Sequence, residues 1–238
     1  LRLDIGIFTL HFILMCIFLV MPLILQDEFA VAADEHWHIY LPVFAVSLLI
    51  MVPFIILAER KQAMKPVFNG AIISLIVATL VFLGSQSFWL LVLGLVIFFA
   101  GFNLLEASLP SLITKTAPAT QKGTAMGVYS SSQFLGAFAG GSAGGLAQQI
   151  WGIDGVFFTV LAVLCLWSLL AFTMKKPGYL STYLLKVKEV TVEQLLAVEG
   201  VVEAALIDED GDDESVAYLK VKKHILDEEK LLSLAASD

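Results

Sequence analysis

Residues 88–110 read FWLLVLGLVIFFAGFNLLEASLP, an apolar stretch that contains one charged side chain, Glu106. The hydrocarbon core of a bilayer is about 30 Å thick, and an α-helix needs about 20 mostly apolar residues to cross it. The stretch therefore predicts a transmembrane helix. The whole chain agrees, because 58% of its 238 residues are hydrophobic and 15% are charged, whereas soluble domains average about 25% charged residues. We predict an α-helical membrane protein.

The same length criterion predicts six transmembrane helices within residues 1–176. The apolar runs exceed what a soluble helix would need, and charged loops separate most of them. The expected spans are residues 4–25, 39–58, 66–84, 88–112, 123–150 and 155–174.

The loops between these spans alternate in charge. Eight Lys and Arg residues lie before residue 177, at the chain start, in loop 59–65, after the fourth span and after the sixth. The alternate loops 26–38, 85–88 and 151–155 contain none. Cytoplasmic loops of membrane proteins carry an excess of Lys and Arg. The pattern predicts that the start of the chain and everything after residue 176 are cytoplasmic.

The composition changes after Pro177 and Gly178, which marks a domain boundary. Residues 178–238 contain six basic and fourteen acidic side chains and account for the net charge of −8, so no basic patch for nucleic acid is expected. Turn residues and hydrophobic periodicity predict a βαββα order, a ferredoxin-like fold that lacks its last strand. The expected strands are 181–187, 201–208 and 215–221, and the expected helices are 192–198 and 226–236.

The chain shows no pattern typical of an enzyme or of a metal protein. Cys16 and Cys165 each lie in an apolar run without a second cysteine nearby, so neither a disulfide framework nor a zinc site is expected. Ser/His/Asp sets and paired catalytic carboxylates are absent from the sequence. We predict no catalytic residues, no metal and no cofactor.

Glycines recur every four residues in the fifth span. Gly136, Gly140 and Gly144 follow this spacing, and Gly141 and Gly145 accompany them. Small residues at such spacing allow helix backbones to approach closely in lipid. We predict that these glycines form a helix-packing face.

Residues 102–146, FNLLEASLPSLITKTAPATQKGTAMGVYSSSQFLGAFAGGSAGGL, and the tail segment VEGVVEAALIDED (198–210) carry a family likeness. Together with six spans whose ends lie on one side, they resemble the C-terminal half of a major facilitator superfamily transporter of the YajR type. The resemblance implies a cytoplasmic ferredoxin-like tail, a location in the inner (plasma) membrane and a missing N-terminal six-helix half before residue 1. Each six-helix half of this superfamily consists of two inverted three-helix repeats.

The resemblance also implies that the first and fourth spans line a transport cavity. Charged residues in a span are expensive and usually face a cavity or a partner. Glu106 and Asn103 are three residues apart and so share a helix face. His11 lies about 10 Å from Asp4, and Glu106 about 13 Å from Lys115, at about 1.5 Å per residue. These similar depths make His11, Asn103 and Glu106 candidates for a proton or substrate pathway.

Two readings of Glu106 stay open. It could carry a proton or contact substrate, together with His11, whose side chain titrates near neutral pH. It could instead pair with Arg60 or Lys122 as a latch at the cytoplasmic end. His11 could equally be an interior histidine with a structural role.

The sequence therefore leaves two alternative functions open. The first is a secondary transporter that exports a small organic compound in exchange for protons by alternating access, with lipid, substrate and protons as its partners. The alternative is a six-span membrane anchor that presents a cytoplasmic interaction or ligand-sensing domain.

Overall fold

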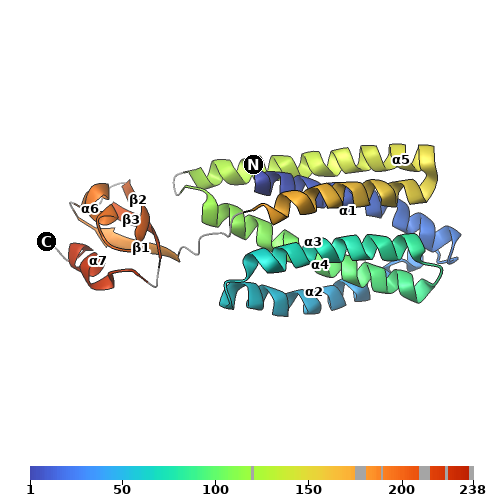
Figure 1. Cartoon of the computed structure of the whole chain (residues 1–238), viewed down its shortest axis with the longest axis horizontal. Helices are drawn as coiled ribbons and strands as arrows, with labels where there is room; N and C mark the ends of the chain where they lie inside the picture. Colours follow the sequence, from blue (N-terminus) through green and yellow to red (C-terminus); the bar gives the residue numbers. More distant parts are fainter. Residues whose placement is uncertain (119–120, 175–180, 189, 209–214, 223–224, 236–238) are drawn as a thin grey trace. The chain divides into compact units, whose positions relative to one another are not determined.

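The computed structural model describes residues 1–118, 121–174, 181–188, 190–208, 215–222 and 225–235. Long helices come first and a small α/β tail follows (Figure 1). Among these residues, five helices are long and apolar enough to cross a membrane, which confirms the predicted helical membrane part. They are α1 (Arg2–Asp27), α2 (Trp37–Arg60), which the short 3-10 helix η1 (Ala33–Glu35) precedes, α3 (Met64–Gly84), α4 (Phe88–Thr116) and α5 (Lys122–Phe172).

Helix α5 is broken in its middle. Its 51 residues would extend about 77 Å at 1.5 Å per residue, more than twice the thickness of a bilayer core. Gly152 adopts φ 71° and ψ −167°, a conformation that glycine reaches without a steric penalty. Figure 1 shows the chain reversing direction within α5. The helix is thus two segments, 122–151 and 153–172, and the five-residue loop expected at 151–155 is a break at one glycine.

The membrane helices differ in how far they are buried. In α1 and in α4, 56% of the most apolar 18-residue stretch is buried. In the segment that contains α2, only 17% of the corresponding stretch is buried. Leu49 of α2 is 73% exposed. The exposed apolar surface of α2 needs lipid or another protein segment to cover it. Most of α2 therefore lies at the edge of this bundle.

The tail forms a three-stranded antiparallel sheet in the order β1-β3-β2. Strand β3 pairs antiparallel with both neighbours, so β1 and β2 run in the same direction on either side of it. This is the arrangement of a split βαβ unit, and it confirms the prediction of a small α/β tail. The elements are β1 (Ser181–Val187), α6 (Val192–Leu196), β2 (Val201–Asp208), β3 (Ser215–Val221) and α7 (Glu228–Ala235).

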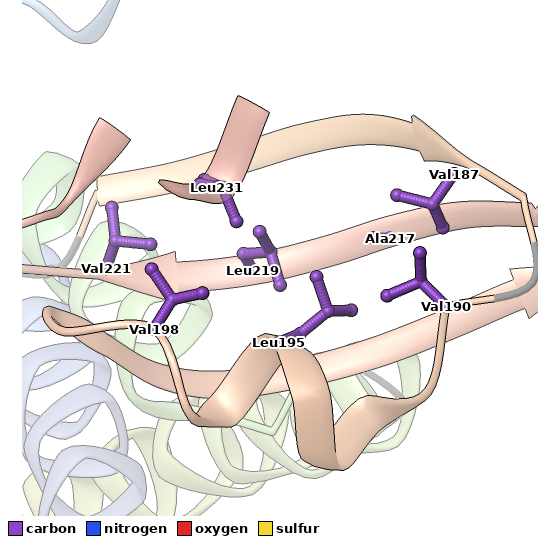
Figure 2. Close-up of a cluster of buried hydrophobic side chains, with 8 residues drawn as sticks. All are labelled: Val187, Val190, Leu195, Val198, Ala217, Leu219, Val221 and Leu231. Atoms are coloured by element: carbon purple, nitrogen blue, oxygen red, sulfur yellow. The ribbon is translucent and has the colours of Figure 1, made fainter. Parts of the chain in front are cut away.

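Both tail helices pack on one face of this sheet (Figure 2). Alternate residues of a strand point to the same face, and Ala217, Leu219 and Val221 of β3 are fully buried there. Leu195 of α6 and Leu231 of α7 complete the cluster from the helix side. The tail therefore has a hydrophobic core of its own, separate from the apolar contacts of the membrane helices.

Contacts divide the chain into two units. One consists of Leu1–Thr114 with Thr124–Pro177, and the other of Lys115–Gly123 with Gly178–Asp238. The predicted boundary after residue 176 stays a prediction. The expected linker at Pro177 and Gly178 lies outside the described residues, and so does the acidic turn at 209–214.

Candidate functional site

Three membrane helices bring a polar cluster together inside the apolar bundle. His11 of α1 lies with Nδ1 3.9 Å from Oε2 of Glu106 on α4. Gln133 of α5 lies with Nε2 2.8 Å from Nε2 of His11. The same amide nitrogen is 3.5 Å from Oε1 of Glu106. We call these three residues the polar cluster.

The glycines of α5 explain how Gln133 reaches His11. A Cβ added at Gly136 would lie 2.2 Å from the carbonyl oxygen of Phe8, and one added at Gly140 would lie 2.2 Å from that of Phe12. The backbones of α1 and α5 are therefore in direct contact. Gln133 precedes Gly136 by three residues and so lies on the same face of α5. The close approach places its amide against α1 at His11.

The two groups of glycines behave differently. Gly144 continues the contact face, since an added Cβ would lie 3.2 Å from Sγ of Cys16. The Cys16 thiol also donates a hydrogen bond to the Gly140 carbonyl at 3.2 Å. An added Cβ at Gly141 or Gly145 would meet nothing within 4 Å. Of these five glycines, only Gly136, Gly140 and Gly144 therefore lie against a neighbouring helix, α1.

The hydrogen bonds indicate which tautomer of His11 fits the cluster. The amide nitrogen of Gln133 is a donor, so Nε2 of a neutral His11 must accept from it. The ring proton then lies on Nδ1, which is 3.3 Å from the Ile7 carbonyl oxygen. A protonated imidazole would carry a hydrogen on both nitrogens, and Gln133 would then have to present its oxygen. A rotation of one amide accommodates both states.

Two oxygens near this cluster have no hydrogen-bond partner. Among the described residues, Oε2 of Glu106 and the hydroxyl of Tyr129 are buried and unsatisfied. Leaving such a group unpaired costs about 1–3 kcal/mol. Tyr129 lies one helical turn before Gln133, on the same face of α5. The Glu106 side chain is nevertheless 36% exposed, so a proton, a water molecule or a polar ligand can reach this carboxylate.

Aromatic packing fixes the other side of His11. The ring of Phe102, one turn before Glu106 on α4, lies edge-on to the imidazole with the centroids 5.9 Å apart. Phe102 also stacks on Phe98 at 6.2 Å. These contacts hold the imidazole between α4 and α5, and they leave Nε2 directed to Gln133.

Asn103 does not join the polar cluster in this structure. Its Nδ2 donates to Oγ of Ser47 on α2 at 3.0 Å, and Ser47 in turn donates to the Phe44 carbonyl at 2.7 Å. Asn103 and Ser47 are both buried. The pair is a hydrogen-bonded contact between α4 and α2, whereas Glu106 faces α1 and α5.

The two latch candidates belong to different units of the chain. Arg60 is exposed at the C-terminal end of α2. Lys122 donates from Nζ to the hydroxyl of Tyr218, and both residues belong to the second unit. Within the described residues, Glu106 makes polar contacts with His11 and Gln133. A latch to Arg60 or Lys122 stays a prediction for another conformation.

Sequence reasoning missed Gln133, Tyr129 and Ser47. Tyr129 and Gln133 are four residues apart and continue the spacing of Gly136 and Gly140. The sequence thus showed that two polar residues lie on the same helix face as the glycines. The sequence did not indicate which helix this face would contact, and so it did not connect Gln133 with His11.

The comparison with protein families gives a match to the Major Facilitator Superfamily over residues 3–199. The chain is 41% identical to the inner membrane transport protein YajR of Escherichia coli K12 over 232 residues, which cover 94% of this chain and 50% of that protein. An uncharacterized transporter, BU466, of Buchnera aphidicola subsp. Acyrthosiphon pisum is 33% identical over 143 residues, which cover 58% of this chain and 36% of that protein.

A further uncharacterized transporter, from Buchnera aphidicola subsp. Baizongia pistaciae, is 32% identical over 168 residues, or 70% of this chain and 43% of that protein. The chain spans about half the length, or less, of the curated relatives it matches. The family match, the similarity to transporters and the apolar helices agree on a multi-pass membrane protein. This chain belongs to the major facilitator superfamily.

Proposed function

We propose that this chain is the C-terminal half of a secondary transporter that exports a small organic compound in exchange for protons. The observation that carries the proposal is the polar cluster of His11, Glu106 and Gln133 between three membrane helices. Ionisable residues inside membrane spans are rare, and they commonly mark ion or proton pathways. An alternating-access cycle would expose the cluster to one side of the membrane at a time, between this half and a preceding six-helix half.

The cluster offers a simple route for proton binding and release. A proton that arrives from the aqueous side binds His11 at Nε2 or the carboxylate of Glu106. If it binds His11, the Gln133 amide rotates so that its oxygen accepts the new N–H. The imidazolium then lies 3.9 Å from Glu106, close enough for an ion pair. Release of the proton on the other side restores the original amide orientation.

The folded tail favours an additional role. We propose that residues 178–238 are a ferredoxin-like domain without its last strand, because the βαββα order and the β1-β3-β2 sheet match that fold. Since the tail has its own core, the alternative function is a membrane anchor that presents an interaction or ligand-sensing domain. Transport without the tail would argue that the tail is accessory, while binding without transport would favour the anchor. Neither function makes the protein an enzyme.

The proposal is tested with the full-length protein in liposomes that contain the pH indicator pyranine. A library of small organic compounds is added under an imposed pH gradient. We expect at least one compound to cause proton movement that empty liposomes do not show. Accumulation of a compound without any proton movement would contradict proton coupling, and a complete absence of compound movement would contradict transport.

A labelling experiment tests the predicted orientation. Two variants each carry one new cysteine at an exposed position. Asp34→Cys places it before α2, and Glu193→Cys places it in α6. In intact cells a membrane-impermeant maleimide should label Asp34→Cys but not Glu193→Cys, because basic loops stay in the cytoplasm. A Cys165→Ser background removes the exposed native thiol. The reverse labelling pattern would overturn the orientation.

A further inference from the structure

A lateral groove of about 550 Å³ lies between α2, α3 and α4. Its walls are almost entirely apolar. The hydroxyl of Ser74 is already bound, because it donates to the Ala71 carbonyl at 2.7 Å. The hydroxyl hydrogen of Ser74 is therefore already used, and the apolar walls suit a hydrocarbon chain.

Small residues create the space. On α3 and α4 the floor contains Gly70, Ala71, Ala100 and Gly101. A Cβ added at Gly101 would lie 2.1 Å from Oγ of Ser74, whereas one added at Gly70 would meet nothing within 4 Å. The two helices thus pack closely at Gly101, while the position above Gly70 is empty. Large side chains of α2 form the opposite wall.

The groove follows α3 and α4 over several helical turns. On α3 it extends from Ala63 to Ser74, a rise of about 16 Å at about 1.5 Å per residue. This is about half of the roughly 30 Å hydrocarbon core. Because Ala63 directly precedes the first residue of α3, the groove begins at the connector between α2 and α3. On α4 its lining continues to Leu93, five residues after the start of that helix.

Basic residues follow the α2 wall of the groove in the sequence, at the end near the connector between α2 and α3. On α2 the wall residues Ile50, Phe54 and Leu57 follow a helical spacing, and Arg60 continues it one turn later. Lys61 is the next residue, and both basic side chains are exposed. Lys65, the second residue of α3, donates to a carbonyl oxygen of α5 at 3.0 Å. Glu59 is the one acidic residue between Leu57 and Lys65, so the rim carries net positive charge.

We propose that this groove binds one anionic phospholipid. One acyl chain lies along α3 and α4, and the phosphate contacts Arg60 and Lys61. The charge of the rim complements the phosphate, and the apolar wall complements the chain. Basic residues at the ends of membrane helices are typical partners of anionic headgroups. The proposal does not depend on transport activity or on which side of the membrane the connector faces.

The test uses the full-length protein and native mass spectrometry with palmitoyl-oleoyl phosphatidylglycerol. We expect one retained lipid per protein. Gly70→Leu places a side chain in the groove and should weaken retention about tenfold, the change that losing contact with two acyl methylenes produces. Gly84→Leu is the matched control, because Gly84 lies on the same helix, outside the groove, with open space around it. Equal retention by Gly70→Leu would overturn the proposal.

A second comparison separates headgroup binding from chain binding. Arg60→Gln combined with Lys61→Gln should reduce retention of phosphatidylglycerol to the level of phosphatidylcholine. A photoreactive benzophenone amino acid in place of Gly70 should crosslink to lipid. Crosslinking only to another segment of the protein would show that a helix covers the groove, and equal retention of both lipids by the unmodified protein would show that the rim does not select anions. Either result contradicts the proposal.

Discussion

Glu106→Gln is expected to abolish compound-dependent proton movement in liposomes while compound binding remains measurable. A carboxamide has nearly the same shape as the carboxylate, but it cannot take up a proton near neutral pH. Its oxygen can still accept from Gln133, whose amide nitrogen is 3.5 Å from Glu106. The change therefore removes the titratable group and leaves the packing of the polar cluster in place. Pyranine fluorescence reports the proton movement, and ligand-dependent thermal shift reports binding.

Asp154→Asn is the control for this experiment. Asp154 is a carboxylate of the same chain that lies two residues after the Gly152 break and is exposed. Its replacement should leave proton movement unchanged. Unchanged proton movement in Glu106→Gln at every pH tested would instead remove Glu106 from the pathway.

The latch predicts a different pattern for the same variant. If Glu106 pairs with Arg60 in another conformation, Glu106→Gln leaves a basic partner unpaired, and breaking a buried ion pair costs about 3–5 kcal/mol. Arg60→Gln should then partly restore transport in the double variant. If Glu106 binds the proton, Arg60→Gln restores nothing, and His11→Asn changes the pH profile of transport, since the two groups would titrate together.

Gly140→Ala is expected to destabilise the membrane part and to impair proton movement, although it changes no polar side chain. The added Cβ would lie 2.2 Å from the Phe12 carbonyl oxygen and 2.6 Å from its Cα. Both are backbone atoms, so α1 itself must shift. Overpacking of this kind costs about 1–3 kcal/mol. The shift would also separate His11 from Gln133, because the same helix contact sets their distance.

Thermal unfolding in detergent and the pyranine assay measure the two effects. Gly141→Ala is the matched control, since an added Cβ there meets nothing within 4 Å. Alanine is also favoured over glycine inside a helix by about 1 kcal/mol, so this variant should be at least as stable as the unmodified protein. Equal unfolding temperatures for the two variants would contradict the proposed contact between α1 and α5.

The two variants together separate chemistry from geometry. Glu106→Gln should reduce proton movement without lowering the unfolding temperature by a comparable amount. Gly140→Ala should lower both. If only the stability changes in Gly140→Ala, the distance between His11 and Gln133 does not matter for proton binding, and the role proposed for the amide is wrong.

Local pattern was sufficient for α4 and for the strands of the tail. The apolar stretch of residues 88–110 predicts α4 because bilayer thickness sets the length of a span, and the helix extends from Phe88 to Thr116. The tail strands 181–187, 201–208 and 215–221 match β1, β2 and β3. Alternation and turn residues operate over a few neighbours and need no tertiary information.

The sequence by itself determined the apolar helices, the α/β tail and the presence of His11 and Glu106 within spans. Only the tertiary structure decided that Gln133 joins them, that Asn103 bonds to Ser47 instead, and that Gly152 alone breaks α5. A polar residue in a span faces whichever helix packs against it. That choice depends on the register of α1 against α5, which the contacts of Gly136 and Gly140 with Phe8 and Phe12 fix. These contacts join residues more than a hundred positions apart, beyond the range of any local pattern.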